Sequence, residues 1–88
     1  MEVRITHIHL SGGESYRNIQ TVRWQNADDA SEWDTDSTAT MVARIRRGWR
    51  VFVWNGWHKV EVAVVGGRFL STETQGQRTD GILKLPRF

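Results

Sequence analysis

Residues 47–57, Arg-Gly-Trp-Arg-Val-Phe-Val-Trp-Asn-Gly-Trp, contain a helix end, a strand and a hairpin turn in succession. Gly48 suits the position just after a helix, because glycine adopts the left-handed conformation at little steric cost. The mostly apolar residues 49–54 predict a strand. Asn55-Gly56 predicts a type I′ turn, after which residues 57–65 return as a long strand. This stretch therefore predicts a helix followed by an antiparallel hairpin.

The residues before this stretch predict the helix itself. Residues 26–36 are polar and acidic, and they predict a loop that leads into a helix over about residues 38–47. Ser37 or Thr38 is the expected N-cap, since a side-chain oxygen there can accept a hydrogen bond from a free N–H of the first turn. The expected apolar face of this helix consists of Met41, Val42 and Ile45.

Two further strands are predicted at the N-terminal end. Residues 2–10 alternate in polarity and are rich in β-branched types, which is typical of a strand. Residues 16–25 have a similar character, and Ser11-Gly12-Gly13-Glu14 between them predicts a turn. A close antiparallel hairpin is the natural connection between two such strands.

The C-terminal third predicts one more short strand and an apolar tail. Gly66-Gly67 predicts a turn, residues 68–72 a fifth strand, and residues 73–81 are polar and turn-forming. Residues 82–88 are apolar enough to pack back on the body of the protein. The order β-β-α-β-β-β over residues 1–88 predicts a single small α+β domain. It consists of an antiparallel sheet of about five strands with one helix packed on one face.

Length and composition limit the class of protein. A chain of 88 residues buries only about 60–65% of its unfolded surface, so its core is thin. The sequence has no cysteine, which excludes a disulfide framework and thiolate chemistry. No apolar run approaches the roughly 18 residues of a membrane span, and the N-terminus does not resemble a signal peptide. We therefore expect a cytoplasmic protein with no membrane partner.

Charge is distributed unevenly along the chain. Residues 1–43 carry three arginines against seven carboxylates, a net charge of −4. Residues 44–88 carry nine basic groups against three carboxylates, a net charge of +6. This asymmetry predicts a face that attracts anions. It also fits a contact in which the acidic segment of one copy meets the basic face of another.

Tryptophan and arginine are unusually frequent. The chain has five tryptophans, and its ten arginines outnumber two lysines. A guanidinium group binds phosphate or carboxylate bidentately and stacks on rings, while indole offers a flat face and one N–H donor. Together they predict a site for a flat, anionic ligand such as a nucleotide. The candidate ligand-binding residues are Trp24, Trp49, Trp54 and Trp57 for stacking, Arg47 and Arg50 for phosphate oxygens, and Arg78 and Asp80 as further contacts.

The same residues also have a purely structural interpretation. The tryptophans can supply the bulk of a thin core, and the arginines at the helix end can satisfy the helix dipole. Trp49 and Trp54 are five residues apart on one strand, so they point to opposite faces and at least one is expected in the core. Trp33 lies in the acidic loop and needs a partner surface, either the sheet or a second subunit.

The sequence offers few candidate residues for a metal or catalytic site. His7 and His9 share one face of a strand, and His58 is a possible third ligand. The acidic run from Asp28 to Asp36 lacks the glycine and glutamate spacing of an EF-hand. Ser11-Gly12-Gly13 lacks the lysine of a phosphate-binding loop. We therefore expect no metal, no cofactor and no catalytic residues.

Three segments of the chain carry a family resemblance. They are the strand end Val22-Arg23-Trp24, the stretch from Arg47 to Trp54, and the ending Arg68-Phe69-Leu70-Ser71-Thr72 with residues 80–88. With these segments the chain resembles the small bacterial and phage domain catalogued as domain of unknown function 3892, a family whose name implies no activity. It departs from the family at Ser71, where arginine is frequent, and at Gly81, where asparagine is frequent. It is also similar in type to phage Thoeris anti-defence proteins that sequester nucleotide-derived signals, which implies a bacterial host or phage-infected cell.

These observations leave three functional hypotheses. The first is a non-enzymatic binding module, homo-oligomeric, that sequesters or senses a nucleotide-derived small molecule. The second is a single-stranded nucleic-acid binder, against which the modest net charge of +2 counts. The third is a protein-interaction domain, since tryptophan and arginine are enriched at binding hot spots.

Overall fold

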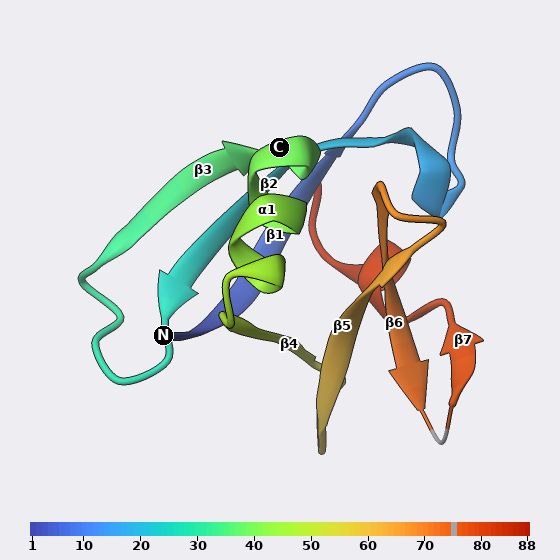
Figure 1. Cartoon of the computed structure of the whole chain (residues 1–88). Coiled ribbons are helices and arrows are strands. Elements are labelled where there is room, and N and C mark those ends of the chain that lie inside the picture. The colour runs from blue at the N-terminus through green and yellow to red at the C-terminus, as the bar shows by residue number, and fades with distance from the viewer. Residues whose placement is uncertain (75) are drawn as a thin grey trace.

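The computed structural model describes residues 1–74 and 76–88, which form one α-helix and one sheet of seven strands (Figure 1). The strands lie in the order β3-β2-β1-β4-β5-β6-β7. The α+β class with one helix is confirmed, but the sheet is larger than expected and is mixed. The elements in chain order are β1 (Glu2–Leu10), the 3₁₀ turn η1 (Tyr16–Asn18), β2 (Ile19–Asn26), β3 (Trp33–Ser37), α1 (Thr38–Arg46), β4 (Arg50–Trp54), β5 (Lys59–Val65), β6 (Phe69–Thr74), β7 (Gln77–Thr79) and the 3₁₀ turn η2 (Gly81–Lys84).

The N-terminal hairpin has the expected first strand and a shorter second one. β1 spans the predicted residues and pairs antiparallel with β2. The prediction that a strand begins at Tyr16 was wrong, because Ser15 and Asn18 form a capping box that holds residues 16–18 in a 3₁₀ turn. Side-chain oxygens that accept from nearby backbone N–H groups compete with strand pairing, as they do here.

The acidic segment contains a strand that its amino-acid composition does not predict. Residues 26–36 were expected to form a loop, but Trp33 to Ser37 pair antiparallel with β2 from Thr21 to Gln25. Aspartate is disfavoured in strands, so local propensity predicts no strand here. The paired edge of β2 overrides that preference, and β3 becomes the outer edge of the sheet.

One pair of strands makes the sheet mixed. β1 and β4 are parallel, with Glu2, Val3 and Arg4 opposite Arg50, Val51 and Phe52. The expectation of a wholly antiparallel sheet was therefore wrong at its centre. A parallel pair needs a crossover connection, and here that connection includes β2, β3 and α1. The crossover places β4 in the middle of the sheet instead of at its end.

The helix begins and ends where the sequence predicts. Ser37 is the N-cap, and its side chain accepts from the backbone N–H of Thr40 at 3.1 Å. Gly48 follows the helix with a φ of +106°, a conformation that favours glycine. Met41 and Val42 are buried, and Ile45 packs against the core. Contacts with β2, β3 and β6 hold the helix on one face of the sheet.

The hairpin between β4 and β5 has a longer loop than the predicted type I′ turn. The backbone N–H of Asn55 donates to the carbonyl of His58 at 2.9 Å, so residues 55–58 form a four-residue loop. Trp54 therefore pairs with Lys59 and not with Trp57. The prediction that a strand begins at Trp57 was wrong, and Trp57 lies in the loop.

The C-terminal region adds two elements that sequence reasoning placed in a turn. Residues 73–81 contain the end of β6, the short strand β7 and the start of η2; Gln75, within the same predicted turn, lies outside the described residues. The tail packs back as expected. It lies beside β1, where the N–H of Ile8 donates to the carbonyl of Pro86 at 3.0 Å and the N–H of Phe88 donates to the carbonyl of Ile8 at 3.1 Å.

The two faces of the sheet differ in what covers them. Alternate side chains of the strands meet α1 in the core, which includes Val3, Ile5, Val22, Trp24, Val51, Val53, Val62 and Leu70. The other alternate side chains point away from that core, and we call their surface the helix-free face. Because residues opposite each other in a sheet share a face, one register row crosses it through all seven strands: Trp33, Gln25, Arg4, Phe52, Glu61, Glu73 and Arg78.

Candidate functional site

Two arginines on the helix-free face lack partners. Arg4 on β1 and Arg23 on β2 are half-buried, and the Nε atom of each is buried with no hydrogen-bond acceptor. Among the residues that the structure describes, neither forms an ion pair with a carboxylate. A buried charged donor without an acceptor is costly, and such groups are rare in native proteins. Because both residues remain partly exposed, an incoming anion can reach the rest of each guanidinium group and offset part of this cost.

Flat rings lie next to the guanidinium group of Arg23. The guanidinium carbon of Arg23 is 5.2 Å from the ring centroid of Trp33 and 4.8 Å from that of Phe88. These distances suit a cation–π contact. His7, opposite Arg23 in the register, meets the Phe88 ring edge-on at 6.4 Å. We call Arg4, Arg23, Trp33 and Phe88 the Arg4–Arg23 site.

A groove continues this site across β4 and β5. Its volume is about 410 Å³, and its lining residues are Glu2, Arg50, Val51, Phe52, Lys59 and Glu61. Lys59 pairs with Glu2 at 2.9 Å and lies 4.5 Å from the ring centroid of Phe52. Arg50 is exposed and forms no ion pair in the described part of the chain. The groove therefore offers one uncommitted guanidinium group beside an aromatic floor.

Trp54 borders the same groove. Its ring meets Phe52 edge-on with centroids 6.4 Å apart, and 42% of the residue is exposed. Arg50 and Trp54 alternate with Val51 and Val53, which lie in the core, so both lie on the helix-free face together with Phe52. The structure thus brings together two of the residues predicted to bind a ligand.

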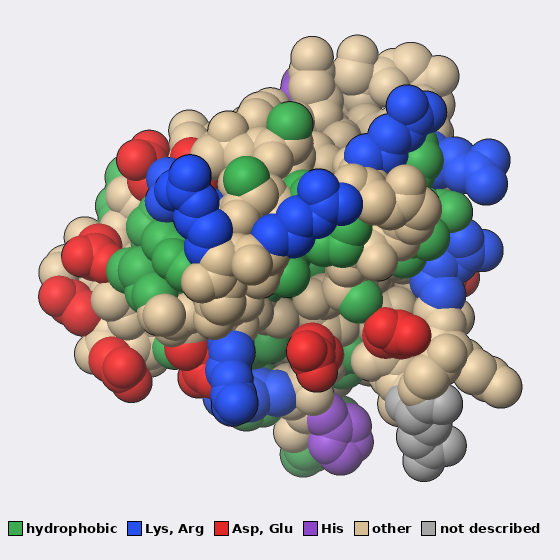
Figure 2. Space-filling model, in the orientation of Figure 1, with side chains coloured by type: hydrophobic (Ala, Val, Ile, Leu, Met, Phe, Trp, Pro, Cys, Tyr) green, Lys and Arg blue, Asp and Glu red, His purple; other side chains and the backbone are tan. Residues whose placement is uncertain are grey.

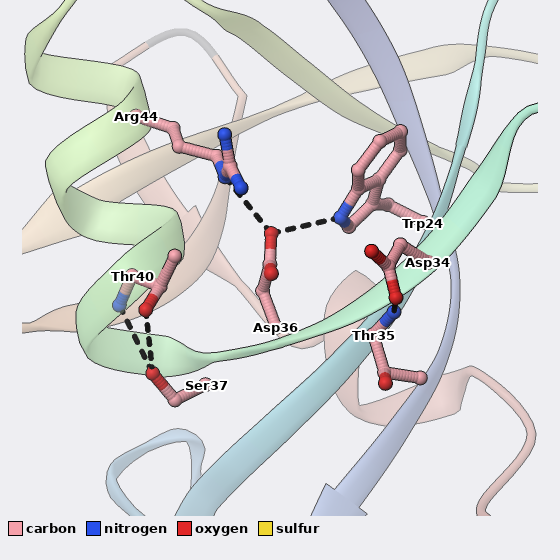
Figure 3. Close-up of polar contacts among 7 residues, drawn as sticks. All are labelled: Trp24, Asp34, Thr35, Asp36, Ser37, Thr40 and Arg44. Carbon is pink, nitrogen blue, oxygen red and sulfur yellow. Dashed lines mark hydrogen bonds and ion pairs between the residues drawn. The ribbon is translucent and has the colours of Figure 1, made fainter.

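Trp24 and Trp49 have structural roles instead. Trp24 is only 6% exposed, and its indole N–H donates to the Asp36 carboxylate at 2.9 Å (Figure 3). The Arg44 Nε donates to the same carboxylate oxygen at 2.9 Å. Trp49 packs edge-on against Trp24 at 5.4 Å, and Arg44 covers Trp49 at 4.5 Å. The Trp24 indole N–H and the Asp36 carboxylate thus have partners within the protein, and the half-buried Trp49 ring contacts both Trp24 and Arg44.

The other predicted residues lie apart from each other. Arg47 is the C-cap of α1 on the helix side of the sheet, and Trp57 is 87% exposed in the loop between β4 and β5. Arg78 on β7 lies over the Tyr16 ring at 4.3 Å. Asp80 is exposed before η2, and its side chain makes no cap hydrogen bond there. The structure therefore does not assemble the full predicted set into one site.

Sequence reasoning missed Arg4, Arg23 and Phe88 as site residues. A signal for the first two was present, because each alternates with the apolar residues of its strand and must point away from them. No local signal places Phe88 beside Arg23, since the two are 65 positions apart and only tertiary packing brings the tail to β1. Trp33 was expected to need a partner surface, and it packs on Arg23 of the sheet.

The histidines and acidic side chains do not converge. Within residues 1–74 and 76–88 no three His, Asp or Glu residues come close enough to hold a metal ion. The acidic loop is organised by its own hydrogen bonds, and the Ser31 hydroxyl and N–H both donate to Asp29. These bonds stabilise the charged carboxylate and lower the pKa of Asp29.

Ser71 and Gly81 both lie in internal packing. Ser71 is buried on β6, and Gly81 lies against the side chain of Thr72. A Cβ atom at Gly81 would come within 3.1 Å of the Thr72 hydroxyl oxygen. That approach is tighter than ordinary van der Waals contact, so a larger residue at this position requires a shift of Thr72.

In the described residues no helix has the length and apolar character needed to cross a membrane. Comparisons of the chain with protein-family models, with curated proteins and with solved structures gave no match.

Proposed function

We propose that the protein is a non-enzymatic binding module that captures a nucleotide-like ligand on the helix-free face. The observation that carries this proposal is the pair Arg4 and Arg23, two half-buried arginines whose Nε atoms have no acceptor among the described residues. They lie on adjacent strands, and phosphate oxygens are acceptors that suit guanidinium groups well. The exposed ring of Trp33 beside them supports stacking of a base.

In this proposal each side chain has a role. Arg4 and Arg23 donate to phosphate oxygens, and Trp33 stacks on the base, a contact typically worth about 1–3 kcal/mol. Arg50 and Trp54 extend the surface across the groove and bind a second phosphate or ring. Trp24, Trp49 and Arg47, which the sequence placed in the site, are assigned to the fold.

The first test is calorimetric titration with mononucleotides, cyclic nucleotides, cyclic ADP-ribose isomers and short oligonucleotides. The double variant Arg4→Gln/Arg23→Gln is expected to weaken binding of the best ligand by about 100-fold or more, because each lost charge-assisted hydrogen bond is worth about 1.5–3 kcal/mol. Arg47→Gln is the matched control, since Arg47 is an exposed arginine on the other side of the sheet. Unchanged affinity in the double variant would remove the basis of the proposal.

A single-stranded nucleic acid is the second candidate ligand, and the length of the register row favours it. Trp33 and Phe52 are three strand spacings apart, about 14 Å, with Gln25 and Arg4 between them. A row of this length can contact more than one nucleotide. Affinity that rises with oligonucleotide length and falls steeply with salt would select this candidate. Saturation by a mononucleotide with weak salt dependence would select the first.

We further propose that the protein forms a homo-oligomer in the cytoplasm. β3 is an edge strand whose residues are mostly exposed, and Trp33 on it is 58% exposed. Such an edge is a template for pairing with a second chain. Acidic side chains gather over β3 and the preceding loop, while basic ones lie over α1 and the opposite side (Figure 2). If the acidic side of one copy binds the basic side of another, sedimentation should show a larger species at low salt than at high salt.

The family resemblance guides the choice of ligands. Likeness to the domain of unknown function 3892 and, more loosely, to Thoeris anti-defence proteins places cyclic nucleotides and cyclic ADP-ribose isomers in the panel. Sequestration of such a signal in a phage-infected cell is the biological form of the proposal. If no ligand of the panel binds and a protein partner is recovered instead, the protein-interaction hypothesis replaces it.

A further inference from the structure

A second group of arginines gathers around the ring of Tyr16, away from the Arg4–Arg23 site. Its members are Tyr16 and Arg17 on η1, Arg68 and Phe69 at the start of β6, and Arg78 on β7. We call these five residues the Tyr16 cluster. Three segments that are far apart in the sequence supply it. In Figure 1, η1 lies beside the turn between β5 and β6, in agreement with the contacts between η1 and β6.

Aromatic rings organise the guanidinium groups. The guanidinium carbons of Arg78 and Arg17 lie 4.3 Å and 5.6 Å from the Tyr16 ring centroid. The Arg17 Nε also donates to the Tyr16 hydroxyl at 3.3 Å. Phe69 meets Tyr16 edge-on at 5.9 Å, and Arg68 lies 4.9 Å from the Phe69 ring centroid. The rings hold the three cations near one another by cation–π contacts.

The positive charge of the cluster is not neutralised within the described residues. Among the residues that the structure describes, no carboxylate oxygen lies within 4 Å of any of its three arginines. Glu73 stands opposite Arg78 in the register between β6 and β7, but the two form no ion pair. Three neighbouring guanidinium groups repel one another, and a multiply charged anion would relieve that repulsion. Basic side chains are visible along this side of the molecule in Figure 2.

The ionisation of Tyr16 reflects this surrounding. The hydrogen bond from Arg17 lowers the pKa of the Tyr16 phenol, and the positive charges of Arg17 and Arg78 lower it further, while desolvation opposes them. Hydrogen bonds and cations both favour the charged phenolate over the neutral phenol. The pKa of the Tyr16 phenol therefore responds to the positive charge of the cluster.

We propose that the Tyr16 cluster is a second ligand site, separate from the Arg4–Arg23 site, that binds a multiply charged phosphate-type oxyanion. Arg17 and Arg78, which both contact the Tyr16 ring, hold the anion, and Arg68 just before β6 extends the site. The chemical class is a phosphate or diphosphate group, because several guanidinium forks match its oxygens and its charge. This inference does not rest on the proposed nucleotide function.

The sequence contains one tyrosine, so the phenolate absorbance reports Tyr16 alone. We would titrate this absorbance against pH in sodium chloride and in sodium pyrophosphate at matched ionic strength. Bound pyrophosphate neutralises the nearby arginines and disfavours the phenolate, so the pKa of Tyr16 is expected to rise in pyrophosphate above its value in chloride. An equal pKa in the two salts would overturn the proposal.

Calorimetric titration of pyrophosphate at neutral pH is the second arm. Arg17→Gln and Arg78→Gln are each expected to weaken binding by about tenfold or more. Arg47→Gln, an exposed arginine outside the cluster, is expected to leave the affinity unchanged. The double variant Arg4→Gln/Arg23→Gln is expected to keep the pyrophosphate-dependent rise in the Tyr16 pKa. Loss of that rise in the double variant, or wild-type affinity in both Arg17→Gln and Arg78→Gln, would place the anion elsewhere.

Discussion

On the helix side of the sheet, Arg44 donates to the Asp36 carboxylate, which also accepts from the indole of Trp24. On the helix-free face, Arg23 lies beside the rings of Trp33 and Phe88, and the Nε atoms of Arg4 and Arg23 have no acceptor among the described residues. Both regions combine arginine with tryptophan. They differ in whether the protein itself supplies the acceptor for the guanidinium group.

This difference separates structural from functional use of the same residue types. The cluster of Arg44, Asp36 and Trp24 is complete without a ligand and stabilises the packing of α1 on β2 and β3. The Arg4–Arg23 site is incomplete, because burial of an unpartnered charged donor costs free energy that a bound anion would recover. The frequency of arginine and tryptophan alone cannot tell these two cases apart.

The largest expected effect comes from truncating a tryptophan on the helix side. Trp24→Ala should lower the free energy of unfolding by about 3–5 kcal/mol, because it leaves a cavity and removes the packing of Trp49. Trp54→Ala, on the helix-free face, should lower it by about 1 kcal/mol or less. Urea denaturation measures both. Equal losses of unfolding free energy in the two variants would show that the two faces do not differ in this way.

The next largest effect on stability is expected at Asp36, whose carboxylate accepts from both Trp24 and Arg44. Asp36→Asn keeps the shape of the side chain but removes its charge, and we expect a loss of about 1–3 kcal/mol in the free energy of unfolding. Asp34→Asn is the control on the same strand, because Asp34 is exposed and accepts only from the adjacent Thr35 N–H. A loss below about 0.5 kcal/mol for Asp36→Asn would show that the carboxylate does not hold Trp24 and Arg44.

The arginines of the two faces are expected to differ in how much they contribute to stability. Arg44→Met should cost about 1–2 kcal/mol of unfolding free energy, since it leaves Asp36 with one donor fewer. Arg4→Met and Arg23→Met should leave stability within about 0.5 kcal/mol of the wild type or raise it, because the unpartnered Nε is removed. Thermal unfolding of the three variants gives the answer. A destabilisation of Arg4→Met as large as that of Arg44→Met would mean that Arg4 serves the fold.

The smallest effect concerns the acidic loop. Hydrogen bonds from Ser31 lower the pKa of Asp29 in the folded protein, so they stabilise the fold above the unfolded-state pKa of this carboxyl group. That contribution is lost as the pH falls through the folded-state pKa. Ser31→Ala should raise the Asp29 pKa toward its ordinary value, as measured by an NMR titration of the carboxyl carbon. Ser11→Ala, outside this loop, should leave it unchanged.

Much of the fold could be predicted from local patterns. The bounds of β1, the Ser37 cap and the Gly48 helix end each depend on a few neighbouring residues, and all three were confirmed. β3 could not be predicted, because its aspartates favour a loop until the edge of β2 supplies hydrogen bonds. The parallel pairing of β1 with β4 depends on where the crossover returns the chain.

The sequence predicted the residue types of the candidate site, but only part of their location in the structure. Arg50 and Trp54 were expected in it and lie together on the helix-free face, whereas Trp24 and Trp49 pack in the core cluster with Asp36. Residue type predicts what a side chain can bind. Burial and neighbours decide whether that capacity is already used inside the protein.

By itself, the sequence determined the chemistry available to this protein and the elements whose signals are local. These are the arginine and tryptophan content, the absence of cysteine, the helix with its caps and the alternation of the strands. Only the tertiary structure decided which arginines find acceptors, because Asp36 reaches Arg44 across the packing of β3 against α1, while no carboxylate among the described residues reaches Arg4 or Arg23. The pairing of β3 with β2 and the packing of α1 set these contacts, and local propensity carries no information about them.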